Sequence, residues 1–402
     1  MERLTTEVCV VGAGPAGLVV ALRLLASGVP CLVLERLAAG ELCARAKAGM
    51  LEHRVVRALE AVGLAGPILT GGSTNGVVEI GVDAERHVFE YAALTGGHGH
   101  FVYPQHLLVS AWAELLAARG GHLRFSSEVI DVEPAAGGAG ATLRARSEGG
   151  AELAIECGAV VLATGAGGRL LPAGIQSHEH CYPFRWLTAM LEQPPLGERT
   201  IYAPHPRGFA AHLRRSPHTT RYYLQVSSAD RLADWSGGRI TAELCTRLGV
   251  EAGALSCGRV AEIDMMDLRV RVREPLQHGP IFLAGDAAHL ITPAGGKGMN
   301  LAIQDALELS EGLIERFANG AGQRLAAYSA TRLPRIWEAQ EFSSWMLTLF
   351  SGGPLGASRA MPDPEATFAQ RLHRAQIERL FTEPRFARWF AHRYAGVDEG
   401  AS

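Results

Sequence analysis

The chain has 402 residues, of which 48% are hydrophobic, and its formal net charge at pH 7 is −3. This length and apolar content predict a globular protein with two or three packed units and exclude a disordered chain. The small net charge gives no reason to expect a nucleic acid or an anionic membrane as a partner, and no apolar run is long enough to span a membrane.

The N-terminus and the cysteines point to a cytoplasmic protein. The segment Met1–Leu4 leads almost directly into the first apolar run, so we expect no signal peptide. The seven cysteines show no regular spacing. An odd and scattered set of this kind is typical of reduced thiols in the cytoplasm.

The first predicted elements are a strand, a tight glycine-rich turn and a helix. The apolar run Val8–Val11 is followed by GAGPAG at residues 12–17, and a second apolar run ends at Glu35. In a dinucleotide site the glycines make the turn, let the backbone approach a pyrophosphate and let helix and strand pack closely. The helix N-terminus offers N–H groups to the phosphates, and an acidic residue accepts hydrogen bonds from a ribose. The candidate dinucleotide contacts are therefore Gly12, Gly14, Gly17 and Glu35.

The remaining pattern predicts a parallel sheet with helices outside it and a second, antiparallel region. From Tyr182 to about Val226 the sequence becomes rich in Tyr, Trp, Pro and Arg, and we interpret this part as an inserted domain. The expected elements, in chain order, are a helix around 51–62, an antiparallel strand within 75–91, a helix over 107–119, a β-meander between 129 and 157, a buried strand over 159–163 and a long helix over about 298–317.

A second motif follows much later in the chain. The buried run Ile281–Ala284 ends in Gly285-Asp286, and a glycine-rich turn then precedes a helix. At the carboxyl edge of a parallel sheet the Asp286 carboxylate can bind a polyol hydroxyl. The following helix N-terminus, with Gly298, Met299 and Asn300, can stabilise negative charge on a reduced isoalloxazine. Alone, the first turn could be structural and Asp286 could cap a helix, but together the motifs match a site for an ADP moiety, a ribityl chain and a flavin ring.

The two motifs together resemble those of the class A FAD-dependent aromatic hydroxylases. The stretches YPFRW at 182–186, IYAPHPRGF at 201–209, RYYLQV at 221–226, EPLQHG at 274–279 and RIW at 335–337 are similar to those of the members that act on 4-hydroxybenzoate. The resemblance covers nearly the whole chain. It implies an α/β fold with an FAD-binding Rossmann-like domain of the glutathione-reductase type, an inserted antiparallel-sheet substrate domain and a helical C-terminal segment. The expected boundaries are 1–74, 101–180 and 266–345 for the FAD-binding domain, 75–100 and 181–265 for the substrate domain, and 346–402 for the C-terminal segment.

The resemblance also implies a reaction. In this family FAD is reduced by NAD(P)H and reacts with oxygen to form a C4a-hydroperoxide, whose terminal oxygen is transferred to a ring carbon ortho to a phenolate. The protein must hold the substrate carboxylate with a cation, ionise the phenol and keep water from the peroxide. We therefore expect FAD, NADPH with NADH as the alternative, molecular oxygen, a small aromatic carboxylate as substrate, a homodimer and no metal.

The resemblance implies roles for individual residues. Arg215 would pair with the substrate carboxylate, and Tyr223 would add a second hydrogen bond. Tyr202 would exchange a proton with the phenol and pass it to Tyr394, while the carbonyl of Pro293 would touch the same oxygen. The other implied contacts are Trp186 as a wall of the pocket, Gln105, Arg221, Arg45 and Lys47 for the flavin cofactor, and Arg36, Arg45 and Arg269 for the nicotinamide cofactor.

Several positions depart from the family pattern and bear on the substrate. A serine that helps to bind the carboxylate is Leu213 here, which removes one hydrogen bond, on the order of 1 kcal/mol. Thr200 and Ala211 replace two pocket leucines, and Met50 replaces a pocket valine. Because alanine opens space beside the ring and threonine adds a polar group, we expect a benzoate with an extra small substituent, such as 3-amino-4-hydroxybenzoate, more readily than plain 4-hydroxybenzoate.

Other departures concern the nicotinamide cofactor and the proton. The central strand ends in Ala163-Thr164-Gly165 where the family has Asp-Gly. Glu41 would repel a 2′-phosphate, whereas Arg36 and Arg45 would attract it. A family histidine that takes part in proton release is Asn75 here, so we expect the proton to leave by a different route.

Other interpretations remain open at this point. An FAD-dependent reductase or dehydrogenase without oxygen insertion fits the strand end Ala163-Thr164-Gly165. A flavin-dependent halogenase is disfavoured because its WxWxIP motif is missing. A non-catalytic flavin-binding protein would have no use for the two tyrosines of the proton relay.

Overall fold

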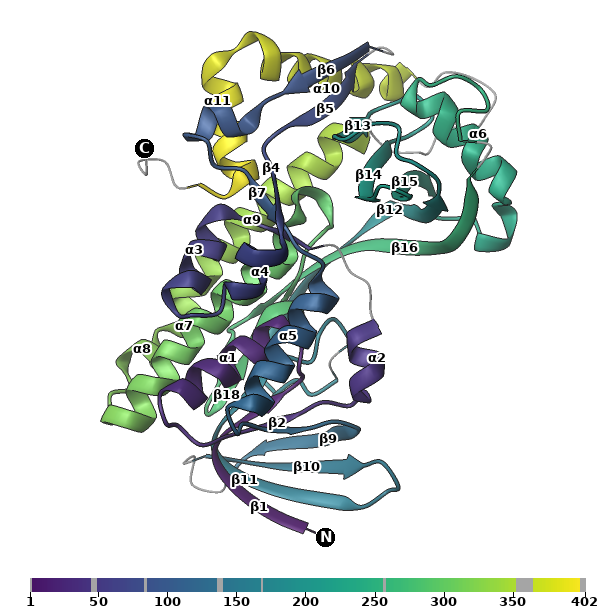
Figure 1. Ribbon diagram of the computed structural model, residues 1–402. Helices are drawn as coiled ribbons and strands as arrows, with labels where there is room; N and C mark the ends of the chain where they lie inside the picture. The colour runs from purple at the N-terminus through teal and green to yellow at the C-terminus, as the bar shows by residue number, and fades with distance from the viewer. Residues whose placement is uncertain are drawn as a thin grey trace. The chain divides into compact units, whose positions relative to one another are not determined.

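The computed structural model describes residues 2–44, 49–82, 85–135, 140–167, 169–255, 258–351 and 364–397. The chain forms two compact units, and each is assembled from three segments that are distant in the sequence (Figure 1). The first unit consists of Met1–Thr74, Phe101–Glu179 and Val270–Glu341. The second unit consists of Asn75–His100, His180–Arg269 and Phe342–Ser402.

The first unit is built on a mostly parallel sheet with the strand order β17-β18-β11-β1-β2-β8. Strand β1 lies between β11 and β2 and pairs in parallel with both of them. Its apolar, β-branched residues Val8–Val11 are buried, as expected for a strand that is covered on both faces. Strands β9 and β10 extend β11 as an antiparallel meander. The bounds are β1 Glu2–Val11, β2 Cys31–Leu34, β8 His122–Arg124, β9 Ser127–Pro134, β10 Ala141–Ser147, β11 Glu152–Leu162, β17 Gln277–His278 and β18 Ile281–Leu283.

Three long helices complete the core of the first unit. Helix α1 (Pro15–Ala26) contacts β1 and β2 and lies beside α5 (Gln105–Ala118) and α7 (Lys297–Asn319) (Figure 1). Proline at the first position of α1 suits a helix start, because its fixed φ is helical and its missing N–H would have no partner there. The shorter elements include α2 Ala39–Ala44, β3 Met50–Leu51, α3 His53–Ala61, α4 Gly66–Gly71, η3 Gly285–Ala287, β19 His289–Leu290, η4 Ala294–Gly296 and α8 Gln323–Ala326.

The second unit is built on a largely antiparallel sheet with the strand order β16-β12-β15-β14-β13-β5-β6. The exception is β13, which pairs in parallel with β5. The single antiparallel strand expected within residues 75–91 is a hairpin of two strands, β5 and β6. The bounds are β5 Val78–Val82, β6 Glu85–Phe89, β12 Gln176–Glu192, β13 Thr200–Ala203, β14 Ala210–Ser216, β15 Thr219–Ser227 and β16 Arg259–Glu274.

Residues alternate between the two faces of this sheet. On one face, Ile201, Ala210, Tyr222 and Leu224 pack in a core with the apolar side of α6 (Gly237–Leu248). Because successive side chains of a strand point to opposite faces, the residues between these core residues point away from α6. We call this opposite side the site face, and its residues are Trp186, Thr188, Thr200, Tyr202, Phe209, Ala211, Leu213, Arg221 and Tyr223.

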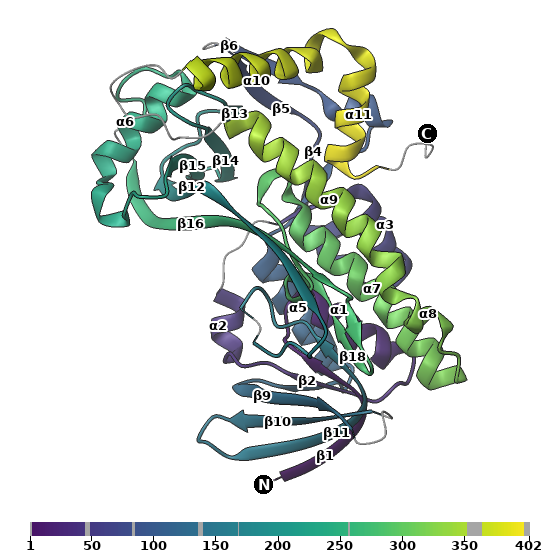
Figure 2. The ribbon, with the colours of Figure 1, turned by 180° about the vertical axis from the view of Figure 1, so that it is seen from behind.

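The C-terminal helices belong to the second unit. Helix α10 (Pro364–Thr382) runs along β5 and β6, where the Phe381 ring lies 5.0 Å from His87 and 6.1 Å from Phe89 (Figure 2). Helix α11 (Pro384–Ala395) packs on the short helix η1 (Tyr91–Thr95). The sequence prediction set residues 346–402 apart, whereas their contacts group them with the second unit. None of the helices in the described part of the chain is long and apolar enough to cross a membrane.

Candidate functional site

At two positions of the turn between β1 and α1, only glycine fits against the neighbouring backbone. Gly12 has a φ of 109°, and a Cβ there would lie 2.3 Å from the carbonyl oxygen of Ala163. A Cβ at Gly17 would lie 1.9 Å from the carbonyl oxygen of Gly12. Both positions therefore exclude any larger residue.

Gly14 is different, and the difference points to a ligand. It caps α1 with an extended backbone, and a Cβ there would have no described protein atom within 4 Å. The packing of the protein thus does not require glycine at this position. The close approach of a phosphate to the helix N-terminus would require it.

Glu35 connects the end of β2 to this turn. Its Oε2 accepts a hydrogen bond from the Ala13 N–H (2.8 Å), and its Oε1 accepts one from the Leu37 N–H (3.0 Å). A carboxylate offers about four acceptor sites, so the oxygens of this buried side chain can still receive ribose hydroxyls.

The Gly285-Asp286 turn is fixed by its backbone and leaves its carboxylate available. The Asp286 carbonyl accepts from Nη2 of Arg271 (3.3 Å), which also donates to the carbonyl of Ala166 (2.9 Å). The Gly285 N–H donates to Oδ2 of Asp305 (3.1 Å). No hydrogen bond from the described residues reaches the Asp286 carboxylate, so this side chain is free to bind a ribityl hydroxyl.

Asp305 itself is a buried carboxylate on α7 that the sequence analysis did not identify. Burial alone would raise its pKa, but the neighbouring His289 and Arg332 hold the pKa of Asp305 below its usual value. The Arg332 Nε donates to Oδ1 of Asp305 at 2.8 Å. The signal that was available is an acidic residue within the otherwise apolar face of a helix, at Ala302, Ile303 and Ala306.

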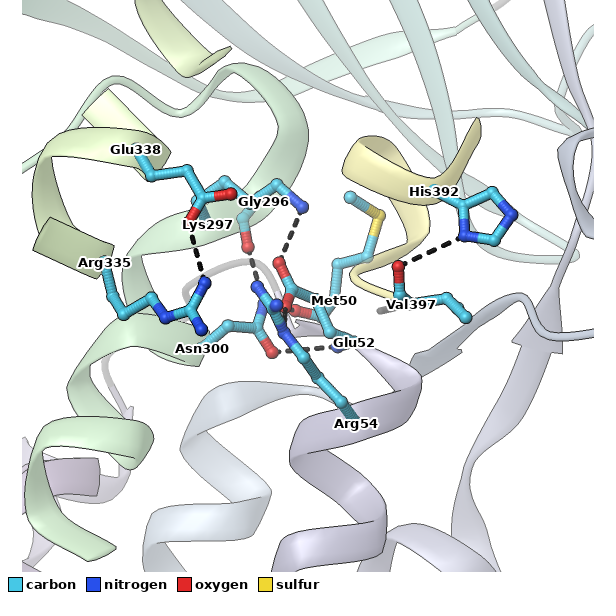
Figure 3. Close-up of polar contacts among 10 residues, drawn as sticks. All are labelled: Met50, Glu52, Arg54, Gly296, Lys297, Asn300, Arg335, Glu338, His392 and Val397. Atoms are coloured by element: carbon cyan, nitrogen blue, oxygen red, sulfur yellow. Dashed lines mark hydrogen bonds and ion pairs between the residues drawn. The ribbon is translucent and has the colours of Figure 1, made fainter. Parts of the chain in front are cut away.

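The start of α7 is held by side chains that Figure 3 shows. Nζ of Lys297 donates to Oε1 of Glu52 (2.6 Å), and both side chains are buried. Asn300, predicted as a cofactor contact, places its amide between protein groups: Oδ1 accepts from the Glu52 N–H (2.8 Å), and Nδ2 donates to the carbonyls of Met50 (3.0 Å) and Gly296 (2.8 Å). Its side chain therefore shapes the turn that precedes α7.

The other predicted residues of the first unit occupy separate positions. Met50 packs on the Gly296 turn, where an added Cβ would lie 2.6 Å from its Cε. Pro293 is exposed, and its carbonyl accepts from the Gly296 N–H (3.2 Å). Gln105 is half-buried as the first residue of α5. Gly298 and Met299 lie in the first turn of α7 and are half-buried.

The predicted nicotinamide contacts come from separate segments of the chain. Arg36, which follows β2 in the first unit, and Arg269, which lies in the second unit, are both exposed. Arg45 and Lys47 lie outside the described residues. The groups of acidic, histidine and cysteine side chains in the described ranges include none that could hold a metal ion.

In the second unit, cross-strand pairing lines up the predicted substrate residues in one row. Thr188 pairs with Tyr223, Tyr223 with Ala211, and Ala211 with Tyr202. Tyr223 and Tyr202 are thus two strands apart, roughly 10 Å between backbones. Because the residue between them is alanine, β14 places no large side chain between the two tyrosines at this level of the sheet.

Aromatic side chains pack around the two tyrosines. Trp186 stacks on Phe209 with ring centres 5.3 Å apart and meets Tyr223 edge-on at 5.4 Å. Phe350, near the end of α9 (Tyr328–Ser351), stacks on Tyr202 at 5.2 Å. The sequence analysis did not identify Phe350, since nothing local distinguishes it from other apolar residues of that helix.

Tyr202 and Tyr394 meet as predicted from the resemblance. Their hydroxyl oxygens lie 2.9 Å apart, and Tyr394 comes from α11. Burial raises the pKa of Tyr202 to about 12, although the bond with Tyr394 partly opposes this rise. Burial also places the pKa of Tyr394 well above its usual value. Both phenols therefore hold their protons near neutral pH and can pass a proton along the pair.

Arg215 is a cation prepared for an anion. It lies where the register of β14 against β15 shifts, beside the Tyr223 hydroxyl, and its Nη2 is buried without a hydrogen-bond partner among the described residues. Burial lowers the pKa of Arg215, yet a guanidinium stays charged in proteins. Because an unpaired buried charge is costly, this group fits an anionic ligand.

The two arginines near Arg215 differ from it because each has a partner within the protein. Arg214 is exposed and forms an ion pair with Glu198. Arg221 lies 5.8 Å from the Tyr223 ring centre and reaches Oγ1 of Thr188 at 3.5 Å. Leu213 pairs with Arg221 between β14 and β15 and is half-buried, and its aliphatic side chain cannot form a hydrogen bond.

These features define the class of protein. Residues 5–343 match the family described as an FAD binding domain, so the chain belongs to that family. It is an FAD-dependent aromatic monooxygenase of the hydroxylase type. The family resemblance found in the sequence is thereby confirmed.

Three individual proteins illustrate the similarity of this chain to known hydroxylases and monooxygenases. The p-hydroxybenzoate hydroxylase of Acinetobacter baylyi is 30% identical over 402 residues, covering 99% of this chain and 96% of the relative. Aklavinone 12-hydroxylase DnrF of Streptomyces peucetius is 28% identical over 354 residues, covering 81% and 71%. The p-nitrophenol 4-monooxygenase PnpA of Pseudomonas putida has a similar structure, with a TM-score of 0.83, 20% identity and coverage of 99% and 100%. At that identity the structural likeness shows the shared fold.

The space at Gly14 gives a direct test of the cofactor site. We expect Gly14→Ala to weaken FAD binding at least about tenfold, because the new methyl group occupies the approach of the pyrophosphate. The cofactor-free variant should keep its unfolding temperature within about 2 °C, since no protein atom is displaced. Fluorescence titration of FAD measures the first effect and calorimetry the second.

Gly66→Ala is the matched control for this variant. A Cβ at Gly66 would also have no described atom within 4 Å, and the residue lies at the start of α4, away from the turn. Unchanged FAD affinity in Gly14→Ala would contradict the assignment of the turn.

Proposed function

We propose that this enzyme hydroxylates a phenol that carries a carboxylate, of the 4-hydroxybenzoate type, at a ring carbon ortho to an activating group. The observation that carries the proposal is the buried, unpartnered Nη2 of Arg215 beside Tyr223, on the same side of the sheet as the Tyr202–Tyr394 pair. A cation at one end and a proton relay at the other fit a substrate with a carboxylate and a phenol on opposite ends of one ring.

The residues of the site face then act in a simple order. Arg215 and the Tyr223 hydroxyl bind the carboxylate, and this pairing orients the ring across Ala211. Tyr202 takes the phenol proton while its own proton moves to Tyr394 and the Tyr394 proton is released in turn to solvent, which leaves an electron-rich phenolate. Trp186, Phe209 and Phe350 exclude water from the ring. When bound, FAD supplies the activation of dioxygen with electrons from a nicotinamide cofactor.

The departures from the family pattern support a substituted ring. Thr200 lies on the site face two residues before Tyr202 and is half-buried, which supports a contact between its hydroxyl and a substituent next to the phenol oxygen. Ala211 is small, which leaves room beside the ring. A 4-hydroxybenzoate with a small polar substituent such as an amino group fits both features.

NADPH is the proposed reductant, and NADH is the alternative. The exposed Arg36 follows Glu35 directly and can bind a 2′-phosphate. One carboxylate oxygen of Glu41 accepts a hydrogen bond from the Ala38 N–H (3.1 Å). Steady-state rates with the two cofactors decide between them: a lower KM for NADPH supports the role of Arg36, and a lower KM for NADH argues against it.

A panel of substituted benzoates tests the proposal. The FAD-loaded enzyme should consume NADPH and oxygen faster when a 4-hydroxybenzoate is present, and mass spectrometry should find the hydroxylated ring. A polycyclic phenol without a carboxylate is the comparison, because hydroxylases of such names occur among the relatives. Cofactor oxidation without any oxygen added to a ring would instead indicate the reductase or dehydrogenase alternative.

Leu213 offers a gain-of-affinity prediction. Leu213→Ser places a hydroxyl beside the proposed carboxylate position and should tighten 4-hydroxybenzoate by about 1 kcal/mol, roughly fivefold in the dissociation constant. Titration of the FAD absorbance with the benzoate measures the change. Equal or weaker binding would show that the carboxylate does not lie beside this residue.

A further inference from the structure

Two buried arginines of β16 hold the turn after β18 by its backbone. Nη2 of Arg271 donates to the carbonyl of Asp286 (3.3 Å), and Nη1 of Arg273 donates to the carbonyl of Ala287 (2.7 Å). Both arginine side chains are more than nine-tenths buried. Hydrogen bonds from a charged donor are stronger than those between neutral groups. The backbone that carries the Asp286 carboxylate is therefore held firmly in place.

Arg271 also holds a second turn, the one that follows β11. The same Nη2 donates to the carbonyl of Ala166 at 2.9 Å. This turn begins at Ala163, whose carbonyl oxygen would lie only 2.3 Å from a Cβ at Gly12 and therefore packs directly on the glycine-rich turn. Arg271 thus connects the backbone beside the glycine-rich turn to the backbone of Asp286, and these are the two ends of the cofactor site.

A guanidinium is well suited to this double contact. Nη2 carries two hydrogens in a fixed plane, so each of the two carbonyls can receive one of them. The charge of Arg271 also has a partner, because its Nη1 lies 3.6 Å from Oε1 of Glu179. A buried charge with such partners can remain in the interior, and its rigid fork sets the distance between the two carbonyls.

We infer that Arg271 is a positioning residue for the flavin half of FAD. By holding the two turns together, it places the Asp286 carboxylate at the distance from the glycine-rich turn at which this carboxylate binds the ribityl chain. The ADP half depends instead on the glycine-rich turn and on Glu35, whose printed hydrogen bonds to the backbone of Ala13 and Leu37 do not involve Arg271. The inference concerns cofactor binding and is independent of the substrate named in the proposed function.

A comparison of FAD with ADP separates positioning from general stability. We expect Arg271→Met to raise the dissociation constant of FAD about tenfold, the contribution of one hydrogen bond from a charged group, and that of ADP less than about twofold. Fluorescence titration measures FAD binding, and displacement of bound FAD measures ADP binding. Arg271→Lys keeps one charged donor and should bind FAD within about threefold of the wild type. It is the variant to compare if Arg271→Met does not fold.

The effect should act through Asp286. Asp286→Ala alone should raise the dissociation constant of FAD about 30-fold, because a charged acceptor for the ribityl chain is lost. Adding Arg271→Met to Asp286→Ala should raise it by less than about twofold more, since no carboxylate is left to position. Full, independent factors in the double variant would mean that Arg271 acts elsewhere.

Arg247→Met is the matched control. Arg247 is an equally buried arginine of the second unit, its Nη1 donates to the carbonyls of Gln225 (2.7 Å) and Phe209 (3.4 Å), and its Nη2 lies 3.0 Å from Oε2 of Glu243. The variant should lower the unfolding temperature and leave the FAD affinity within about twofold of the wild type.

Two results would overturn the inference. One is an equal loss of FAD and ADP affinity in the Arg271 variants, which would make Arg271 a general support of the first unit. The other is an FAD affinity in Arg271→Met that equals that of the wild type. The titrations contain no aromatic substrate, so failure of the proposed hydroxylation would leave their outcome unchanged.

Discussion

Replacing Tyr202 with phenylalanine should lower the rate of hydroxylation about 100- to 1000-fold and leave substrate binding nearly unchanged. In the proposed mechanism the Tyr202 hydroxyl takes the phenol proton, and removal of a positioned acid–base group typically costs this much. The ring and its stacking on Phe350 stay, and the carboxylate anchor at Arg215 is not touched. Single-turnover kinetics and a binding titration separate the two quantities.

Tyr222→Phe is the control for Tyr202→Phe. Tyr222 is also a buried strand tyrosine of the same sheet, but it packs in the core with α6. Removal of the Tyr222 hydroxyl should change the free energy of unfolding and leave the turnover rate unchanged. If Tyr202→Phe lowers rate and affinity by equal factors, or lowers neither, Tyr202 serves only in packing.

The second large effect is expected at Arg215. Arg215→Met should weaken 4-hydroxybenzoate binding by about 3 kcal/mol, roughly 150-fold, because the substrate carboxylate would then be buried without its cation. A phenol without a carboxylate should bind the variant and the wild type about equally. The difference between the two ligands isolates the carboxylate pairing from any general damage to the pocket.

Arg214→Gln is the control for this effect. The side chain is the exposed neighbour of Arg215, and an exposed ion pair contributes little. Its loss should change binding less than about threefold. A larger effect at Arg214 than at Arg215 would mean that the carboxylate lies elsewhere.

The parts of the cofactor site that the sequence predicted are those set by local rules. The turn at residues 12–17 needs Gly12 and Gly17 for reasons that lie within a few residues or in the next strand, so a short motif reports them. The same holds for Asp286, whose place at the end of a buried strand follows from the Gly-Asp pair. The family to which these motifs pointed was confirmed by the comparisons.

The parts that were missed depend on contacts between distant segments. Phe350 contacts Tyr202, about 150 residues away in the chain. Asp305 accepts a hydrogen bond from the Gly285 N–H, although Asp305 lies on α7, which begins after Gly285 in the chain. Periodicity places such residues on a buried face but does not say which partner they meet.

The roles of the site residues in the second unit come from the family resemblance and remain proposals, which the geometry of the sheet supports. Strand alternation alone would have placed Tyr222 and Tyr223 on opposite faces of the sheet, because neighbouring strand residues point to opposite faces. It could not have shown that Nη2 of Arg215 is left without a partner, which depends on every side chain around it.

The fate of isotopically labelled dioxygen shows directly whether the enzyme hydroxylates a benzoate ring. The FAD-loaded wild-type protein is supplied with NADPH, a 4-hydroxybenzoate and labelled dioxygen, and the product is analysed by mass spectrometry. We expect a hydroxylated ring that carries one labelled oxygen atom beside the intact carboxylate. Substrate-stimulated cofactor oxidation that yields only labelled peroxide and an unchanged benzoate, for every member of the panel, would contradict it.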